Sequence, residues 1–279
     1  MAEAVLPEVA DTDEVRAALA RAARRSRLKA EVRLTISFAR RDLHSQYRQS
    51  ALTLLWSIVQ PMLIVAVYAI VFSQILRVQG NGLPYLSFVI AGLAVWRYFS
   101  AGLSQATSFI DRSGTLSKVY FRREIIPLSG CVSALVDLGI SLVALVVIAW
   151  IQGLPPTIHL LALPLVLIVL LTYTAAIAIM LATITVFIRD VAHAMPTISQ
   201  VLFLASPILY PQSQIPPRLA FLGTVNPIAV AAEALRDVTL AGTWPDLGLL
   251  LVHLVIGCAF LVIAIVYLRS IENRIVDVV

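Results

Sequence analysis

The chain has 279 residues, of which 59% are hydrophobic and only 13% are charged, and its mean hydropathy is +0.90. Soluble domains carry about 25% charged residues, so this composition excludes a soluble globular protein. The net charge is +5, and the positions of the basic residues carry more information than this total.

The N-terminal region predicts a polar tail followed by an amphipathic helix. Residues 1–13 are acidic, lack the apolar core of a secretory signal and are expected to be disordered. Residues 14–51 predict a cytoplasmic helix in the membrane interface, with its basic residues toward anionic headgroups or a partner. The alternative is a charged helix in solvent. The apolar residues that share one face at helical spacing are Leu28, Val32, Ile36, Ala39 and Leu43.

Six apolar segments follow, each a candidate membrane span. About 20 apolar residues in a helix cross a hydrocarbon core of roughly 30 Å, and irregular backbone does not face lipid. The predicted spans are residues 52–76, 85–109, 126–151, 158–187, 194–210 and 247–268. The sequence therefore predicts an all-α integral membrane protein, with a six-span domain over residues 52–268 and a tail over residues 269–279.

The distribution of basic residues predicts the orientation of these spans. Of the 21 Lys and Arg residues, 17 precede the first span, follow the last or lie in the loops on that side of the membrane. Only Arg77, Arg218 and Arg236 fall on the opposite side. Cytoplasmic loops carry the excess of basic residues, so both termini are expected in the cytoplasm.

The longest loop on the opposite side, residues 211–245, is rich in proline. Its sequence predicts folded structure rather than a simple connection between two spans. Residues 228–240 within it predict an amphipathic helix, with Glu233, Arg236 and Asp237 on its polar side. We expect short helices that dip back into the outer leaflet, with protein or water around any irregular backbone.

Two ionisable residues lie inside predicted spans, where charge is costly and is usually paired. Arg97 lies about 18 Å below the outer end of its span, and Asp137 lies about 16 Å from the inner end of the next one, at 1.5 Å per residue. The two are level in a core of roughly 30 Å, which predicts an Arg97–Asp137 ion pair. The alternative is direct contact with a substrate. His253 in the last span is expected to be a buried polar group of the core.

The sequence contains no arrangement that predicts bond chemistry. There is no phosphate-binding G-x-x-x-x-G-K-[ST] loop, no nucleophile–base set and no metal-ligand cluster. Cys131 and Cys258 lie in apolar segments and are expected to be buried thiols. We therefore expect a chain that is not an enzyme and that holds no cofactor or metal.

Short motifs spread over residues 38–279 resemble the ABC-2 type exporter permeases for lipid-linked polysaccharides, a group that includes O-antigen, galactan and teichoic-acid exporters. Each motif is weak alone, but their order and spacing together are specific. They are Arg41-Asp42-Leu43, Tyr47-Arg48-Gln49-Ser50, Leu55-Trp56, Gln60-Pro61, Lys118 to Arg123, Ile126-Pro127, Arg189 to His193, Ser206 to Pro211 and Asn226-Pro227.

The resemblance implies where a separate ATP-hydrolysing subunit docks. Residues 111–124 match the cytoplasmic coupling helix of the family, and the basic helix before the first span matches its interface helix. Aromatic anchors flanked by basic residues suit such a contact, although an ordinary basic loop has the same composition. The residues implied in this contact are Lys118, Tyr120, Phe121, Arg122 and Arg123 in the loop, and Arg33, Arg40 and Arg41 in the helix.

The resemblance also implies a pathway for the cargo, and aromatic rings pack against sugars of many kinds. The candidate pathway residues are Trp56, Tyr68, Phe72, Phe203 and Tyr210. The alternative is the belt of interfacial aromatic residues, which explains Trp56 and Tyr210 better. Residues 211–245 match the re-entrant external helices of the family.

The expected function is the permease half of an ATP-driven exporter of a lipid-linked polysaccharide. The resemblance implies a bacterial plasma-membrane protein that acts as a homodimer, with two copies of an ABC ATPase that bind ATP and Mg²⁺. The alternatives are an ABC-2 permease for a drug or small lipid and, from another class, an ion-coupled secondary transporter. No nucleic-acid partner is expected.

Overall fold

The computed structural model describes residues 30–44, 59, 63–75, 77, 80–107 and 122–271. In these ranges the chain is helical, and apart from an isolated bridge between Gly80 and Leu83 it forms no strand. The predicted disordered tail, residues 1–13, lies outside the described residues. Most of the predicted coupling helix and of the C-terminal tail lie outside them as well.

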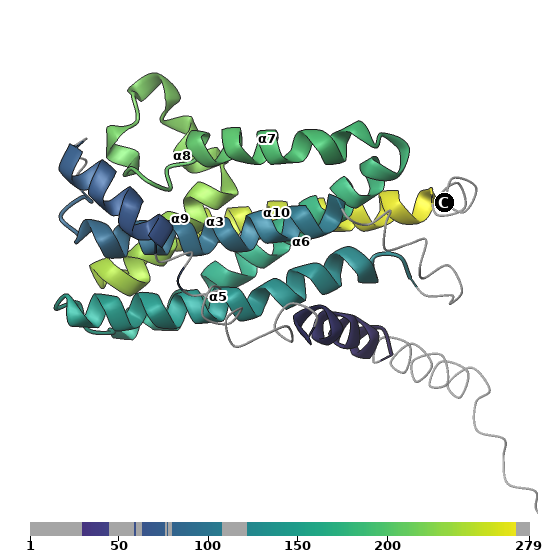
Figure 1. Cartoon of the computed structure of the whole chain (residues 1–279), viewed down its shortest axis with the longest axis horizontal. Helices are drawn as coiled ribbons and strands as arrows, with labels where there is room; N and C mark the ends of the chain where they lie inside the picture. The colour runs from purple at the N-terminus through teal and green to yellow at the C-terminus, as the bar shows by residue number, and fades with distance from the viewer. Residues whose placement is uncertain are drawn as a thin grey trace, which may run out of the picture.

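Two helices without a label come first, over residues 30–44 and 63–70, and the second continues as a π-helical turn. The labelled helices then follow in chain order (Figure 1). They are η1 Val71–Ile75, α3 Tyr85–Thr107, α5 Ile125–Ile151, η2 Ile158–Ala162, α6 Leu163–Phe187, α7 Asp190–Ala205, η3 Gln212–Gln214, η4 Pro217–Leu219, α8 Phe221–Val225, α9 Pro227–Arg236, η5 Asp237–Ala241 and α10 Leu247–Ser270.

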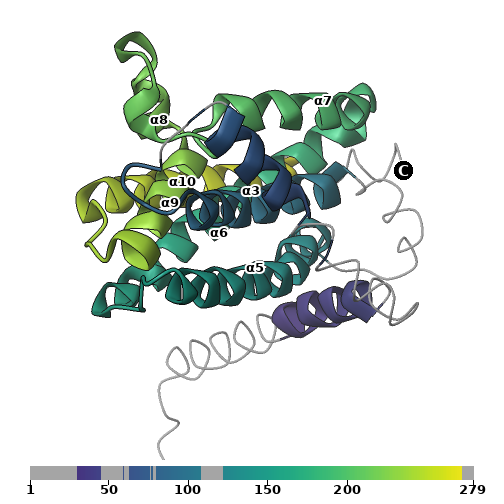
Figure 2. The same ribbon diagram turned by 60° about the vertical axis from the view of Figure 1, so that its left-hand side comes forward.

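The four long helices α3, α5, α6 and α10 run side by side, and α7 lies along one side of them (Figure 1). Helix α6 packs most extensively against α10, and α3 packs most extensively against α5. The helix of residues 30–44 lies outside this bundle, on the side of α5 (Figure 2). The short helices η3, η4 and α8 lie at the opposite end of the molecule from the C-terminus (Figure 1).

Four of the helices are long and apolar enough to cross a membrane: α3, α5, α10 and the continuous pair η2–α6. The predicted spans 85–109, 126–151, 158–187 and 247–268 are confirmed as such candidates. The pair 217–225 and 227–241 passes the same test together, but it is bent by 84°, as in a broken span or a re-entrant loop. The fold is therefore all-helical, with four or five candidate spans in the described part of the chain.

The other two predicted spans differ from this set for separate reasons. Helix α7 has 16 residues, which at 1.5 Å per residue is shorter than the hydrocarbon core. Pro207 and Pro211 follow its end, which is where the backbone leaves the helix. Of the first predicted span, 52–76, the structure describes residues 59 and 63–75, and residue 59 and those from 63 on are helical.

The burial pattern fits a bilayer as the solvent of the bundle. Most of α3 and α6 is buried, whereas less than a third of the most apolar stretch of α5 and of α10 is buried, although both helices are strongly apolar. The exposed side chains include Val143, Trp150, Val255 and Val262. A continuous apolar surface of this kind would aggregate in water and is the ordinary outer surface of a helix in lipid. The chain is therefore a multi-pass membrane protein.

Polar residues inside α6 bond within their own helix, which explains why this span tolerates them. The hydroxyl groups of Thr174 and Thr183 donate to the carbonyls of Leu170 and Ile179, at 2.8 and 2.7 Å. This bond to the preceding turn satisfies a hydroxyl group without a partner from another helix.

Side-chain caps fix where α9 and α10 begin. Asn226 Oδ1 accepts from the backbone N–H of Ile228 at 2.9 Å, and Pro227 occupies the first position of α9. Asp246 Oδ1 accepts from the N–H of Leu249 at 2.9 Å, at the start of α10. Both residues are strong N-caps, and Pro is favoured immediately after a cap.

Candidate functional site

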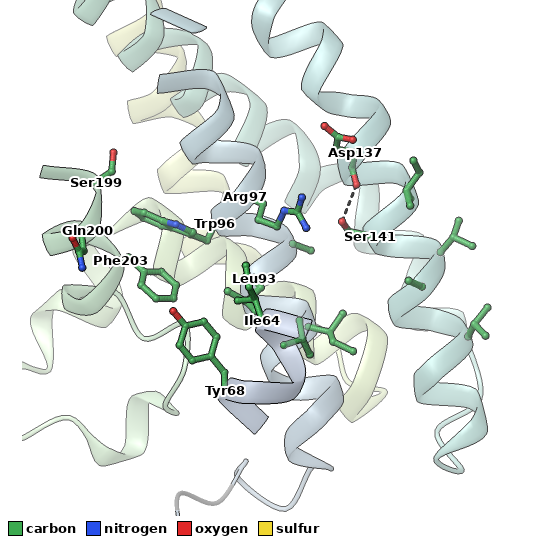
Figure 3. Close-up of a pocket in the computed structure, with 17 residues that line it drawn as sticks. Ile64, Tyr68, Leu93, Trp96, Arg97, Asp137, Ser141, Ser199, Gln200 and Phe203 are labelled. Atoms are coloured by element: carbon green, nitrogen blue, oxygen red, sulfur yellow. Dashed lines mark hydrogen bonds between the residues drawn. The ribbon is translucent and has the colours of Figure 1, made fainter. Parts of the chain in front are cut away.

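A cavity of about 730 Å³ lies among the helix of residues 63–75, α3, α5 and α7. It is at the depth of the spans, since α3 and α5 contribute residues from the middle of their length. Aliphatic side chains such as Ile64, Leu93 and Val147 form much of its wall, and polar side chains occupy other parts of it. Figure 3 shows the aromatic residues on one side of this cavity and the charged residues on the other.

The aromatic side of the cavity joins three helices that are far apart in the sequence. The ring of Phe203 in α7 lies 6.0 Å from that of Tyr68 and 5.3 Å from that of Trp96 in α3 (Figure 3). Phe72 lies 6.2 Å from Tyr68 in an edge-to-face arrangement. Tyr68, Phe72 and Phe203, three of the predicted pathway residues, therefore form one cluster.

The remaining pathway candidates do not join this cluster. The hydroxyl group of Tyr210 donates to the carbonyl of Leu204 at 3.1 Å, in the turn after α7. Trp56 lies outside the described residues. Trp96 lies in the cluster but is absent from the sequence-based set, although its position directly before Arg97 in an apolar span could have drawn attention to it.

The charged side of the cavity contains Arg97 from α3 and Asp137 from α5. In Figure 3 the guanidinium group of Arg97 extends toward α5, where Asp137 and Ser141 lie. The salt bridges found in the described ranges include none between Arg97 and Asp137, and the hydroxyl group of Ser141 donates to the backbone carbonyl of Asp137 at 2.8 Å. The direct ion pair stays a prediction.

A second polar centre lies around the buried Arg236 of α9, at the end of the bundle that the sequence predicts to be external. Its side chain is 1% exposed and donates to the carbonyls of Phe88, Pro207 and Ile208 at 3.3, 3.2 and 2.7 Å. Its Nη1 also donates to Glu233 Oε2 at 3.0 Å, and its guanidinium group lies 3.6 Å from the centre of the Phe88 ring. The sequence placed Arg236 on the polar side of its helix, but the structure buries it between α3 and the turn after α7.

Arg236 completes the hydrogen bonding of an irregular turn. Residues 206–211 leave the helix of α7, and non-helical backbone at membrane depth requires protein partners. Arg236 supplies donors to two carbonyls of this turn, and the hydroxyl group of Tyr85 donates to a third, that of Leu209. The amide of Asn226 donates to Ser206 Oγ at 2.8 Å. The turn is thus held by side chains of α3, α9 and the cap residue of α9, in addition to the backbone bond from the N–H of Ile208 to the carbonyl of Ser206.

Gly92 permits this close approach. A Cβ atom at this position would lie 2.6 Å from the carbonyl oxygen of Ile208 and 2.7 Å from Nη2 of Arg236. Both distances are shorter than van der Waals contact, so no larger residue fits here without movement of the turn. Sequence patterns alone give no signal for such a contact.

His253 of α10 connects two long helices to the external segment. Its Nε2 lies 2.8 Å from the carbonyl of Thr224 in α8, and its Nδ1 lies 3.2 Å from the hydroxyl group of Tyr173 in α6. A carbonyl only accepts, so we assign the proton to Nε2 and infer that Tyr173 donates to Nδ1. Both ring nitrogens are then satisfied by a neutral imidazole, as expected of a buried structural histidine.

At the end of the bundle that the sequence predicts to be cytoplasmic, the structure describes part of the predicted ATPase-docking set. Arg33, Arg40 and Arg41 are exposed on the helix of residues 30–44. Arg122 is exposed, and Nη1 of Arg123 is buried without a hydrogen-bond partner in the part of the chain that the structure describes. Lys118, Tyr120 and Phe121 lie outside the described residues.

The described end of the predicted docking segment, residues 122–124, is joined to other helices by ion pairs. Arg122 Nε lies 2.9 Å from Glu31 Oε1, and Arg269 Nη2 lies 2.6 Å from Glu124 Oε1. The acidic partners were not predicted from the sequence, because ion pairs across distant segments leave no local pattern. The described residues contain no group of three or more His, Cys, Asp or Glu side chains that could hold a metal ion.

Comparison with known proteins gives a consistent result. Three related proteins are each named O-antigen export system permease protein RfbA. One from Myxococcus xanthus is 36% identical over 65% of this chain and 70% of its own length. Two from Klebsiella pneumoniae are 29% and 28% identical over 75% of this chain and 81% of their own lengths.

The sequence pattern of the ABC-2 type transporter family matches residues 33–240. This range begins in the helix of residues 30–44 and includes the cavity, the irregular turn and Arg236. Because the match covers most of the chain, the protein belongs to the ABC-2 type transporter family, as a membrane subunit.

Proposed function

We propose that this chain is the permease of an ATP-driven exporter that moves an O-antigen polysaccharide across a bacterial plasma membrane. The observation that carries the proposal is the similarity to three O-antigen export permeases over two thirds or more of their length. As a membrane subunit of this family, the chain is a transport component, not an enzyme, and binds no cofactor itself. ATP and Mg²⁺ belong to a separate ABC ATPase.

The cavity supports a glycan-bearing cargo. An aromatic cluster next to polar side chains suits sugar rings. Aromatic faces contact the apolar face of a sugar, and polar side chains form hydrogen bonds with its hydroxyl groups. The aliphatic wall next to it suits the lipid part of a lipid-linked glycan. Tyr68, Trp96 and Phe203 are the residues that we place along this pathway.

The proposed assembly is a homodimer with two copies of the ATPase. Each chain has six spans, with both termini in the cytoplasm, and residues 211–245 form re-entrant external helices around the exit. One chain contributes too few helices to surround a polymer, so the pathway lies where two chains meet. Closure of the ATPase on ATP moves the coupling and interface helices, and these move the first and fifth spans.

Reconstitution with the partner ABC ATPase tests the function. In nanodiscs, a polyprenyl-linked O-antigen should stimulate ATP hydrolysis, and the same lipid without glycan should stimulate it less. Equal stimulation by a small amphiphile would favour the alternative, a permease for a drug or small lipid. Transport by the chain without the ATPase would refute the proposal.

Substitution of the aromatic cluster tests the pathway. Tyr68→Ala with Phe203→Ala should reduce export without changing recovery of the ATPase in a pull-down. Trp150→Ala is the matched control, since Trp150 is an aromatic residue that is 66% exposed on α5 and does not line the cavity. Equal loss of export in both variants would assign the effect to the fold rather than to the pathway.

Substitution of the docking residues tests the ATPase contact. Tyr120→Ala with Phe121→Ala should weaken ATPase recovery or uncouple hydrolysis from export while the permease stays folded. Full recovery of the ATPase together with full export would refute this docking assignment.

A further inference from the structure

Four charged residues of alternating sign form a continuous series at the cytoplasmic end of the molecule. Glu31 pairs with Arg122 through two contacts, at 2.9 and 3.2 Å. Arg122 Nη1 lies 3.9 Å from Glu124 Oε1, and the same oxygen accepts from Nε and Nη2 of Arg269 at 3.2 and 2.6 Å. We call Glu31, Arg122, Glu124 and Arg269 the ionic series.

The ionic series joins three parts of the chain that are distant in sequence. Glu31 lies in the helix of residues 30–44, Arg122 and Glu124 lie in the turn just before α5, and Arg269 lies in the last turn of α10. Arg122 directly follows residues 108–121, which hold most of the proposed ATPase-docking segment. The series therefore begins where the permease would receive force from its ATPase.

Glu124 is the central member of this series. Its side chain is 9% exposed, whereas those of Arg122 and Arg269 are each 46% exposed. Glu124 occupies the N-cap position of α5, but its side chain makes no capping bond to that helix. A carboxylate at a helix start ordinarily binds the free N–H groups there. Here the structure directs it to α10 instead, which is the arrangement expected if contact between helices is its role.

Exposed ion pairs contribute little to stability, because solvent screens them and the side chains lose freedom. A largely buried carboxylate that receives two bonds from one guanidinium group is different, because loss of either partner leaves a charge without compensation. The Glu124–Arg269 contact is therefore stronger than the exposed Glu31–Arg122 contact, and it fixes the spacing between α5 and α10.

The far end of α10 reaches the external segment. Helix α10 packs along α6, and His253 in its outer half bonds to Thr224 of α8. Coupling between distant sites runs through rigid helices and through networks of ion pairs. A displacement of the docking segment can thus reach the external helices through Glu124, Arg269 and α10, on a route separate from the cavity.

We propose that Glu124 is a positioning residue that couples the ATPase-docking segment to α10, through its ion pair with Arg269. The inference rests on the proposed function, because it requires an ATPase that pushes on this end of the permease. Glu124 does not line the cavity. Its loss should lower the amount of glycan exported per ATP hydrolysed.

A double-mutant cycle in proteoliposomes tests the proposal. The full chain is reconstituted with its ATPase and polyprenyl-linked O-antigen, as wild type, Glu124→Gln, Arg269→Gln and the double variant. Three quantities are measured: ATPase recovery, hydrolysis rate, and glycan exported per ATP. Arg218→Gln is the matched control, since Arg218 is exposed on η4 at the opposite end of the molecule.

Each single variant should export at least about fivefold less glycan per ATP, the lower end of the usual coupling between sites. The double variant should be no worse than the more damaging single variant, because both act through one contact. Arg269→Lys keeps the positive charge and should export nearly as much glycan per ATP as the wild type. This variant provides a test even if Arg269→Gln fails to fold.

Two results would overturn the positioning role. The first is an unchanged amount of glycan exported per ATP in the single variants, and the second is a double variant in which the two single losses of export per ATP multiply. A fall in folded protein, hydrolysis and export in equal proportion would also overturn it, since that pattern marks a purely structural contact. Failure of the wild-type chain to bind any ATPase is a different result, which would refute the proposed function itself.

Discussion

Replacement of the buried Arg236 by Met should strongly destabilise the turn over residues 206–211 and the helices α3 and α9 around it. Met fills much of the same volume, so the change removes donors and charge rather than packing. The carbonyls of Pro207 and Ile208 then lose their side-chain donor, at a cost of about 1–3 kcal/mol each. Loss of the contact with the Phe88 ring adds about 2 kcal/mol in a desolvated site.

These contributions are not additive, and together they give a loss of about 3–6 kcal/mol. Folded proteins are stable by about 5–15 kcal/mol, so a loss of this size is a large share of the total. The assay is thermal unfolding of the purified protein in nanodiscs, with limited proteolysis of residues 206–225 as a local probe. We expect a lower unfolding temperature and faster cleavage of this segment.

Three further variants make the assay decisive. Arg236→Lys should recover only part of the stability, because an ammonium group cannot replace the planar guanidinium group, which donates to several carbonyls at once. Gly92→Ala should mimic the loss, since its Cβ would meet both Ile208 and Arg236. Arg218→Met is the exposed control and should stay within about 0.5 kcal/mol of wild type. Wild-type stability in Arg236→Met would refute the reasoning.

Three further predictions follow from contacts at other positions, each checked by unfolding or export. Asn226→Ala removes the N-cap of α9 and should cost about 1 kcal/mol, whereas Asn226→Asp keeps the acceptor and should cost less. Gly102→Val should lower the unfolding temperature more than Gly102→Ala, because even a Cβ would lie 2.4 Å from Cγ2 of Thr174; equal stability of both would contradict the tight α3–α6 contact. If Arg97 and Asp137 compensate each other, Arg97→Leu with Asp137→Leu should damage expression and export less than either single change, and additive damage would exclude the pair.

Hydropathy predicted much of the fold because lipid leaves the backbone few alternatives. A helix is the only way for one continuous segment to satisfy its own backbone in hydrocarbon, so the apolar runs 85–109, 126–151, 158–187 and 247–268 gave helices with nearly the predicted limits. The end of α7 was misplaced by five residues. Its backbone turns where donors from α3 and α9 are available, and such donors are invisible to a local pattern.

The candidate site was predicted in part, for a similar reason. Tyr68, Phe72 and Phe203 were named from residue type, and the fold brings them together. The position of Arg236 could not be predicted, since amphipathic spacing assigns a charged residue to solvent unless a specific set of acceptors surrounds it. The same holds for Glu124, whose partner lies 145 residues away in the chain.

The turn over residues 206–211 has a mechanical consequence for α7. Its C-terminal end is anchored to α3 and α9 by side-chain bonds, whereas Arg189 and Asp190 at its N-terminal end are exposed. These bonds oppose sliding of the helix along its axis. A force on the N-terminal end would therefore tilt α7 about its anchored end, and Phe203, close to that end, would move less than Ser199 and Gln200, the other residues of α7 in the cavity wall.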